Sequence, residues 1–282
     1  MNLVTVTCER DHRILLLQAK SIQKFVEKCT HWIIINDQNP YSIDWQSLLS
    51  PYYDNERHIL KIIYHDPKYW KLAHNGWIIQ QILKLEAINF VQDDYLLLDS
   101  KNFFVVTTDL ATWKNDGCGV LVSEQINSEV YEAWGITNQL YAGRLGMPIL
   151  KIYYATETPF FIKKEIVIDA ITHTNFAEWF IKDSNFKPGP SEFLYYSYFL
   201  TKNNHQFKWS RRHHCLWPDP NHLYHVNKWF KESDFNLMEI CGIHRVWIER
   251  ANLETKQKVV NWLNDLGILD EHTKQIFSLE DE

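Results

Sequence analysis

Asp99 is the residue of this sequence best placed to do chemistry. It directly follows the apolar run Tyr95–Leu98, which predicts a short buried strand, and the polar residues after it predict a turn. In an open α/β sheet, ligands bind beyond the carboxyl ends of the strands, so we expect this carboxylate to face a crevice. Aspartate is also common in turns where it has only a structural role. Asp11 and Asp37 end or follow two earlier expected strands, at the same edge of the sheet.

The elements that must position these side chains alternate along the first half of the chain. Apolar runs predict strands, and apolar residues at helical spacing predict the helices between them. The strands are expected at Leu3–Thr7, His31–Asp37, His58–Tyr64 and Tyr95–Leu98, with helices over Arg10–Lys28 and Gly76–Val91. This order predicts a parallel sheet with helices on both faces.

The second half of the chain is less regular. Ile149–Ala155 resembles a strand, and Phe160–His173 begins as an extended segment and turns helical. Ser191 is expected to cap a helix that runs to Leu200. Ile243–Ile248 is read as a short strand, followed by a helix around Glu254–Leu266.

The segment GWIIQQILKLEAINFVQDDYLLLDSKNFF, which starts at Gly76, resembles the stretch of GT-A glycosyltransferases that leads through their DxD motif. It is most similar to an uncharacterised phage and bacterial family with a Gly-Trp-x-x-Gln-Gln-x-x-Lys-Leu helix before an acidic strand end. Three shorter pieces follow in the order of that family: Thr158-Pro159-Phe160-Phe161, Ser191-Glu192 and Ile243-His244-Arg245.

The resemblance implies a GT-A-like (Rossmann-like) α/β fold. Its sheet is mixed but mainly parallel, with helices on both faces, and the C-terminal half is irregular. We expect this domain to span residues 1–250, with residues 251–282 adding a C-terminal helix and an acidic tail packed on it.

The same resemblance implies roles for some residues, and strand-end positions and residue types suggest roles for others. Asp99 and Glu192 are expected to be catalytic, with Glu192 as the general base if configuration inverts. Asp99 and His244 are expected at a metal or phosphate. The donor is expected to contact Asp99, Lys101, Asp11, Asp37, Gln81, Lys84 and Thr158. An aromatic and basic rim for the acceptor is expected at Trp209, Arg211 and Arg212.

Lys101 departs from the family pattern, because it stands where the second acid of the DxD motif belongs. Two carboxylates suit Mg²⁺ or Mn²⁺, whereas a lysine cannot bind either cation. Two interpretations stay open. Asp99 holds the metal together with His244, or Lys101 itself neutralises the leaving diphosphate and the activity needs no metal.

Composition and missing motifs exclude several classes. The net charge is −6 and no basic block exists beyond Arg211-Arg212, so nucleic acid is not expected as a partner. The five cysteines are scattered without a CxxC pair, and no signal peptide or membrane-length apolar run is present, so we expect a cytoplasmic protein. GxGxxG, GxxxxGK[ST], GxSxG and HExxH are all absent. A zinc site at the histidines around His222 is disfavoured by intervening prolines.

The sequence therefore predicts a glycosyltransferase that moves a sugar from a nucleotide-sugar donor to an acceptor hydroxyl on a glycan, a lipid-linked molecule or a small molecule. The alternatives are a catalytically silent nucleotide- or sugar-binding protein on the same scaffold and a nucleotidyltransferase. The last would need a glycine-rich loop near the N-terminus, which Thr7-Cys8-Glu9-Arg10 lacks. Oligomeric state, donor and acceptor are left open.

Overall fold

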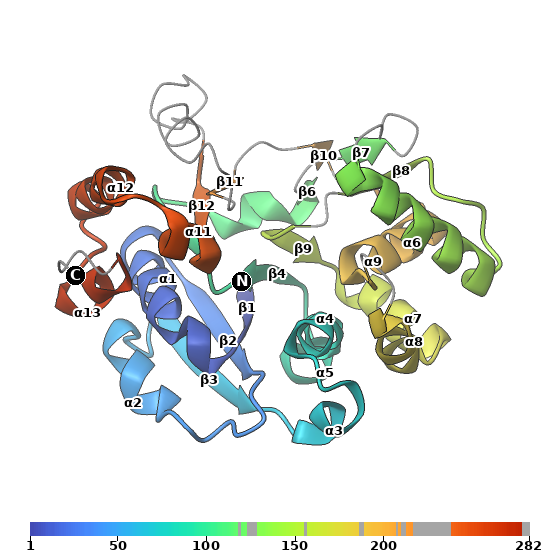
Figure 1. The fold of residues 1–282 in the computed structure, drawn as a ribbon, viewed down its shortest axis with the longest axis horizontal. Helices are drawn as coiled ribbons and strands as arrows, with labels where there is room; N and C mark the ends of the chain where they lie inside the picture. Colours follow the sequence, from blue (N-terminus) through green and yellow to red (C-terminus); the bar gives the residue numbers. More distant parts are fainter. Residues whose placement is uncertain are drawn as a thin grey trace.

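The structure is a computed structural model, and it describes residues 1–117, 120–122, 129–154, 157–185, 189–206, 208–209, 213–216 and 238–277. Its central sheet has five strands in the order β3-β2-β1-β4-β9 (Figure 1). These are β1 (Asn2–Thr7), β2 (Cys29–Ile35), β3 (His58–Tyr64), β4 (Tyr95–Asp99) and β9 (Phe160–Ile162). The first four are parallel and β9 is antiparallel, so the expected mainly parallel sheet is confirmed.

The strand order creates a topological switch point at the carboxyl end of β1. The chain runs outward from β1 to β2 and β3, and then returns to place β4 on the other side of β1. Thr7 at the end of β1 aligns with Ile35, and Val6 aligns with Asp99. The ends of the three strands therefore meet at one edge of the sheet, where ligands bind in folds of this kind.

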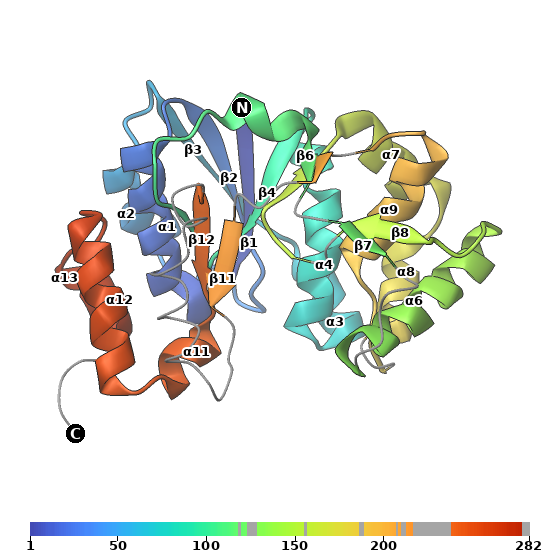
Figure 2. The same cartoon turned by 90° about the horizontal axis from the view of Figure 1, so that it is seen from above.

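Helices cover both faces of the sheet, and Figure 2 shows α1 and α4 on opposite sides of β1. The helices α1 (His12–Phe25) and α2 (Trp45–Leu49) share an apolar cluster with β2. The largest apolar cluster joins β1 and β4 to α4 (Gly76–Glu86) and α5 (Ile88–Val91), which follow the short α3 (Trp70–Ala73). Residues of β4 such as Leu96, Leu97 and Leu98 are completely buried, as expected of a strand covered on both faces.

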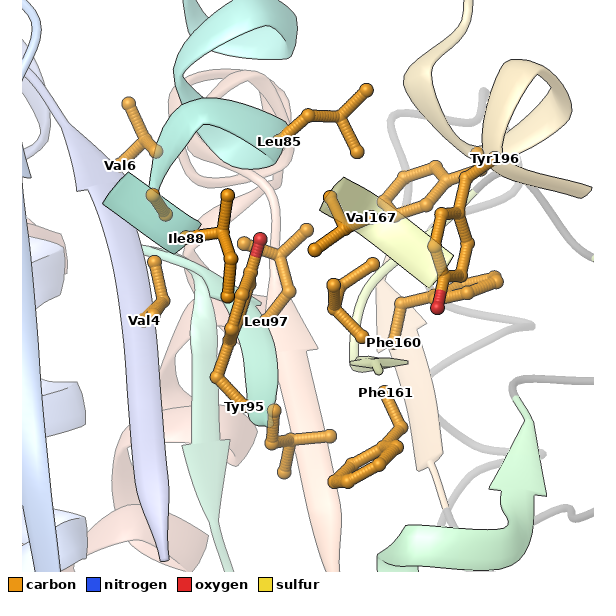
Figure 3. Close-up of a cluster of buried hydrophobic side chains, with 14 of the residues drawn as sticks. Val4, Val6, Leu85, Ile88, Tyr95, Leu97, Phe160, Phe161, Val167 and Tyr196 are labelled. Atoms are coloured by element: carbon orange, nitrogen blue, oxygen red, sulfur yellow. The ribbon is translucent and has the colours of Figure 1, made fainter. Parts of the chain in front are cut away.

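The same large cluster fastens a group of later helices to the edge of the sheet. Figure 3 shows Tyr95 and Leu97 of β4, Phe160 and Phe161 of β9, and Tyr196 packed together. The helices of this group are α6 (Glu129–Leu145), α7 (Lys164–His173), α8 (Phe176–Lys182) and α9 (Glu192–Lys202). Helix α9 begins as predicted, because Ser191 accepts a hydrogen bond from the backbone N–H of Leu194.

A small sheet in the order β11-β12-β5 lies beside α1 and was not expected from the sequence. Its strands are β5 (Asn102–Phe104), β11 (His213–Leu216) and β12 (Ile240–Ile243). Two further strand pairs join β6 (Asp116–Gly117) to β10 (Lys208–Trp209) and β7 (Val120–Val122) to β8 (Ile152–Tyr154).

The expected strand at Ile243–Ile248 is wrong. The strand β12 ends at Ile243 and helix α11 (Arg245–Arg250) follows. The reason is local, because the Nδ1 atom of His244 accepts a hydrogen bond from the backbone N–H of Val246 and caps the new helix. The expected late helix is present as α12 (Leu253–Asp265), and it is followed by α13 (Glu271–Lys274).

Helices α12 and α13, near the end of the described part of the chain, pack against α1. Val259, Val260 and Leu263 of α12 share an apolar cluster with Ile14 and Leu17 of α1. The tail after residue 277 lies outside the described residues. No helix within the described ranges is long and apolar enough to cross a membrane.

Candidate functional site

Two adjoining cavities open at the carboxyl ends of β1, β2 and β4. The larger has a volume of about 460 Å³ and the smaller about 160 Å³. Arg10, Asp11 and Gln80 line both of them, so the two form one continuous crevice at the topological switch point. A crevice of this combined size is within the range of small-molecule and cofactor sites.

The larger cavity is rich in hydrogen-bond acceptors. Its lining includes Glu9, Asn36 and Asp37. Asp37 Oδ2 accepts a hydrogen bond of 2.9 Å from the backbone N–H of Glu9, and burial raises the pKa of Asp37 above its ordinary value. Acceptors of this kind fit the hydroxyl and amine groups of a ligand.

Asn36 is the most distinctive side chain of the larger cavity. Its Nδ2 atom donates a hydrogen bond of 2.7 Å to the carbonyl oxygen of Gly76, which fixes the orientation of the amide. The Oδ1 atom is buried and has no hydrogen-bond partner among the described residues. An unpaired buried acceptor is costly, so a ligand donor at this position would relieve the cost.

Two tryptophans add flat apolar surface to the same cavity. Trp70 and Trp77 both line it, and Trp77 is 46% exposed. Gly76 lies between them in the sequence and carries no side chain that would fill the space. An ideal Cβ at Gly76 would lie 3.0 Å from the ring of Trp70, so the glycine allows this close approach.

The smaller cavity is built around the turn that follows β4. The side chain of Gln18 in α1 donates hydrogen bonds of 2.8 Å to the carbonyl oxygens of both Asp99 and Asn102. The Oδ1 atom of Asn102 accepts a 2.8 Å hydrogen bond from the backbone N–H of Asp99, and Ser100 donates to Thr7. These bonds hold the turn in one conformation.

Pairing of β5 with β12 brings a distant segment to this turn. The backbone N–H of Ile243 donates a 3.1 Å hydrogen bond to the carbonyl oxygen of Lys101. The next two residues, His244 and Arg245, therefore join Asp99 and Lys101 in lining the smaller cavity. Arg245 and Asp11 approach to 3.8 Å. Arg10, Lys101 and Arg245 outnumber the carboxylates of Asp11 and Asp99, so the lining of the smaller cavity carries a net positive charge.

Four charged side chains of alternating sign run from the wall of the smaller cavity, at Lys101 and Asp99, into the interior, at Lys84 and Glu192. Lys84 Nζ lies 2.9 Å from both Glu192 Oε1 and Asp99 Oδ1, and Lys101 contacts the other oxygen of Asp99. We call Glu192, Lys84, Asp99 and Lys101 the ion-pair chain. Its members come from α9, α4, β4 and the turn after β4, so the chain ties the later helices to the edge of the crevice.

The pairing in this chain decides the protonation of its members. Burial alone would raise the pKa of Asp99, but the ammonium groups of Lys101 and Lys84 outweigh it and hold the pKa well below its ordinary value. Burial alone would lower the pKa of each lysine, and the neighbouring carboxylates outweigh it and raise both. All three groups therefore stay charged at neutral pH.

The pKa of two further side chains of the smaller cavity is shifted. Burial, followed by the positive charge of Lys101, lowers the pKa of His244. Burial raises the pKa of Asp11, against the opposing effect of Arg245. His244 is therefore uncharged at neutral pH.

The residues expected at the site fall into three groups. Five of them line the crevice: Asp11, Asp37, Asp99, Lys101 and His244. Four are buried and line neither of the two cavities: Gln81, Lys84, Thr158 and Glu192. Of the expected acceptor residues, Trp209 belongs to β10, whereas Arg211 and Arg212 lie outside the described residues.

The expected general base, Glu192, has neighbours unlike those of a solvent-facing base. Its side chain is 4% exposed and paired with Lys84, and its backbone N–H donates a 3.1 Å hydrogen bond to Gln81. The role of Glu192 as a base stays a prediction.

A divalent cation, which the family resemblance implies, does not fit the residues around Asp99. Mg²⁺ and Mn²⁺ need several oxygen ligands, but both oxygens of Asp99 already contact ammonium groups. In the part of the chain that the structure describes, no group of three or more His, Cys, Asp or Glu side chains could hold a metal ion.

Sequence reasoning gave no role in the site to several residues that the fold brings to it. Arg10, Trp70 and Trp77 line the crevice, and Gln18 holds its turn. The position of Arg10 just after β1 was a usable signal, because the same strand-end rule that selects Asp11 also selects it. Nothing local marks Gln18, whose bonds to the turn span 81 and 84 residues of sequence.

Comparison with known proteins identifies the fold. No protein-family model matches the sequence, and a search of curated proteins found no match. The chain has a GT-A-like, Rossmann-like α/β fold. Among solved structures, it is similar to the galactosyltransferase LgtC in complex with donor and acceptor sugar analogues. It is 12% identical with a TM-score of 0.52, and the match covers 98% of this chain and 100% of that one.

Proposed function

We propose that this protein is a glycosyltransferase that moves a sugar from a nucleotide-sugar donor to an acceptor hydroxyl. The observation that carries the proposal is the division of the crevice into an acceptor-rich, aromatic cavity and an adjoining cationic one. A nucleoside offers hydroxyl and amine donors and a flat ring to the first. A diphosphate offers negative charge to the second. The similar structure of a galactosyltransferase with sugar analogues supports the same class of reaction.

The larger cavity supplies the contacts that a nucleoside needs. The Oδ1 atom of Asn36 and the carboxylate of Asp37 accept hydrogen bonds from the ribose or the base. Trp77, which is partly exposed in the lining, offers its ring for stacking. This assignment gives Asn36 the partner that its buried oxygen lacks.

The smaller cavity supplies the charge that the reaction needs. In the transfer, the bond between the anomeric carbon and the diphosphate oxygen breaks, and its electron pair leaves with the diphosphate. The acceptor oxygen forms the new bond to the anomeric carbon, and its proton passes to the departing diphosphate or to water. Arg10, Lys101 and Arg245 stabilise the negative charge that develops on the leaving group.

Substitution of Arg245 tests the division of the crevice. Binding of UDP, GDP, CMP and dTDP and of the matching nucleosides would be measured by calorimetry. Arg245→Gln is expected to weaken binding of the preferred nucleoside diphosphate by about tenfold or more and to leave nucleoside binding unchanged. Arg250→Gln, an exposed position on the same helix, is the control and should bind like the unmodified chain.

Turnover then separates the proposed enzyme from the alternatives. Release of the nucleoside diphosphate from a nucleotide sugar, with a new glycosidic bond on an acceptor, supports the transferase. Binding without release across glycan, lipid-linked and small-molecule acceptors favours the silent binding protein. A chain that binds no nucleotide at all contradicts both.

A further inference from the structure

We propose that the ammonium group of Lys101 takes the place of a divalent cation, so that the protein binds the diphosphate of its donor without metal. This inference rests on the proposed function and concerns the same crevice. The turn position that a second metal-binding acid would occupy is held by a cation of the chain itself.

The first argument is the state of Asp99. Lys84 lies 2.9 Å from its Oδ1 atom and Lys101 contacts its Oδ2 atom. A metal ion at this carboxylate would have to displace an ammonium group and would then lie beside it. A metal ion and an ammonium group beside the same carboxylate repel each other strongly when they are largely removed from water. The carboxylate of Asp99 is therefore suited to pair with lysine and not to bind a metal ion.

The second argument is that Lys101 is positioned in advance. Its carbonyl oxygen accepts the hydrogen bond from Ile243, and Gln18 holds the carbonyl oxygens of the residues at both ends of the turn. Its side chain is only 14% exposed and contacts Asp99. A charge that is already oriented stabilises a leaving group without a cost of reorganisation.

The third argument is the charge of the cavity. Arg10, Lys101 and Arg245 line it together with the carboxylates of Asp11 and Asp99, so three cationic side chains face two anionic ones. The lining therefore carries a positive excess that suits a diphosphate.

His244, which the family pattern would make a metal ligand, uses its Nδ1 atom to cap α11.

The test measures binding of the preferred nucleoside diphosphate by calorimetry, in EDTA and in saturating Mn²⁺. The unmodified chain is expected to bind equally well in both. Lys101→Met is expected to lose about tenfold or more in both, while Lys101→Arg keeps metal-independent binding. Lys101→Asp, which restores two acids, is expected to bind weakly in EDTA and to regain affinity with Mn²⁺.

Lys28→Met serves as the matched control. Lys28 is exposed and directly precedes β2, at the opposite edge of the sheet from the crevice, so its loss should leave binding unchanged. Unmodified protein that binds about tenfold more weakly in EDTA than in Mn²⁺ overturns the inference and leaves the proposed function intact. Unchanged binding by a folded Lys101→Met variant also overturns it. Failure to bind any nucleotide in either condition removes the proposed function, and this inference with it.

Discussion

Lys84 shows how a buried charge can serve two neighbours at once. It lies between the carboxylates of Asp99 and Glu192, and both of these contacts are 2.9 Å. The backbone carbonyl of Lys84 also accepts a 2.7 Å hydrogen bond from the hydroxyl of Tyr95, which fixes the helix at this point. Removing one member of such a group costs more than removing a matched pair, because the remaining charge stays buried without a partner.

This arrangement predicts unequal effects on stability. Lys84→Met leaves Glu192 without its paired cation and is expected to cost about 3–5 kcal/mol of unfolding free energy. Glu192→Gln is expected to cost less, since Lys84 still forms its ion pair with Asp99. The double variant Lys84→Met, Glu192→Leu should lose less than the sum of Lys84→Met and Glu192→Leu alone. Urea denaturation of the three single variants and this double variant measures the coupling. If the losses of unfolding free energy in the two single variants add up to that of the double variant, the ion pair between Lys84 and Glu192 does not stabilise the fold.

The expected residues whose place in the crevice could be predicted from the sequence are those governed by a local rule. Asp11, Asp37 and Asp99 end or follow strands, and that position alone brings them to the crevice. Glu192 and Lys84 follow no such rule, because their surroundings depend on how α9 packs against α4, across 108 residues of sequence. A pattern within one element cannot report that packing.

At the scale of elements, the start of α4 shapes the larger cavity. Asn75 caps the helix by accepting a hydrogen bond from the N–H of Trp77, and Asn36 donates to the carbonyl of Gly76. The end of β2 is thereby joined to the start of α4. Trp70, from α3, lies against Gly76 and lines the same cavity.

The close approach at Gly76 predicts a binding defect from one methyl group. In Gly76→Ala the new Cβ would lie 3.0 Å from Trp70, so the ring must move by a few tenths of an ångström within the cavity wall. Nucleoside binding is expected to weaken by a few-fold, roughly the effect of 1 kcal/mol. Gly143→Ala in α6, whose Cβ would meet nothing within 4 Å, is the control. Titration calorimetry with the preferred nucleoside measures the affinity of both variants. Equal affinities of Gly76→Ala and Gly143→Ala would contradict the role given to Trp70.

At the scale of the whole molecule, the sequence predicted the sheet better than what surrounds it. Runs such as His58–Tyr64 have the bounds that the structure gives them, because a run rich in β-branched and aromatic residues between polar turns marks a strand locally. The pairing of β5 with β12 was missed, since it joins segments more than a hundred residues apart. That pairing is what brings His244 and Arg245 to the crevice.

A buried polar network lies between the sheet and α1. The hydroxyl of Thr5 donates to Gln18 and contacts His31, and the ring of His31 also contacts the hydroxyl of Tyr53 at 2.6 Å. His31 is completely buried, and burial lowers its pKa to about 3. The same Gln18 side chain holds the turn of Asp99, so the network links the stability of the core to the geometry of the site.

His31 gives the folding stability a pH dependence with a definite sign. The unfolded histidine titrates near its ordinary value of 6.5, and the folded one stays neutral down to about 3. Between these values the unfolded state binds the extra proton, so stability is complete above the unfolded pKa and falls as pH drops through this window. The expected slope is on the order of 1 kcal/mol per pH unit, and His31→Gln should reduce it. Urea midpoints from neutral to moderately acidic pH measure this slope, with the exposed His272→Gln as control. A slope that His31→Gln leaves unchanged would mean that the buried imidazole does become protonated in the folded protein.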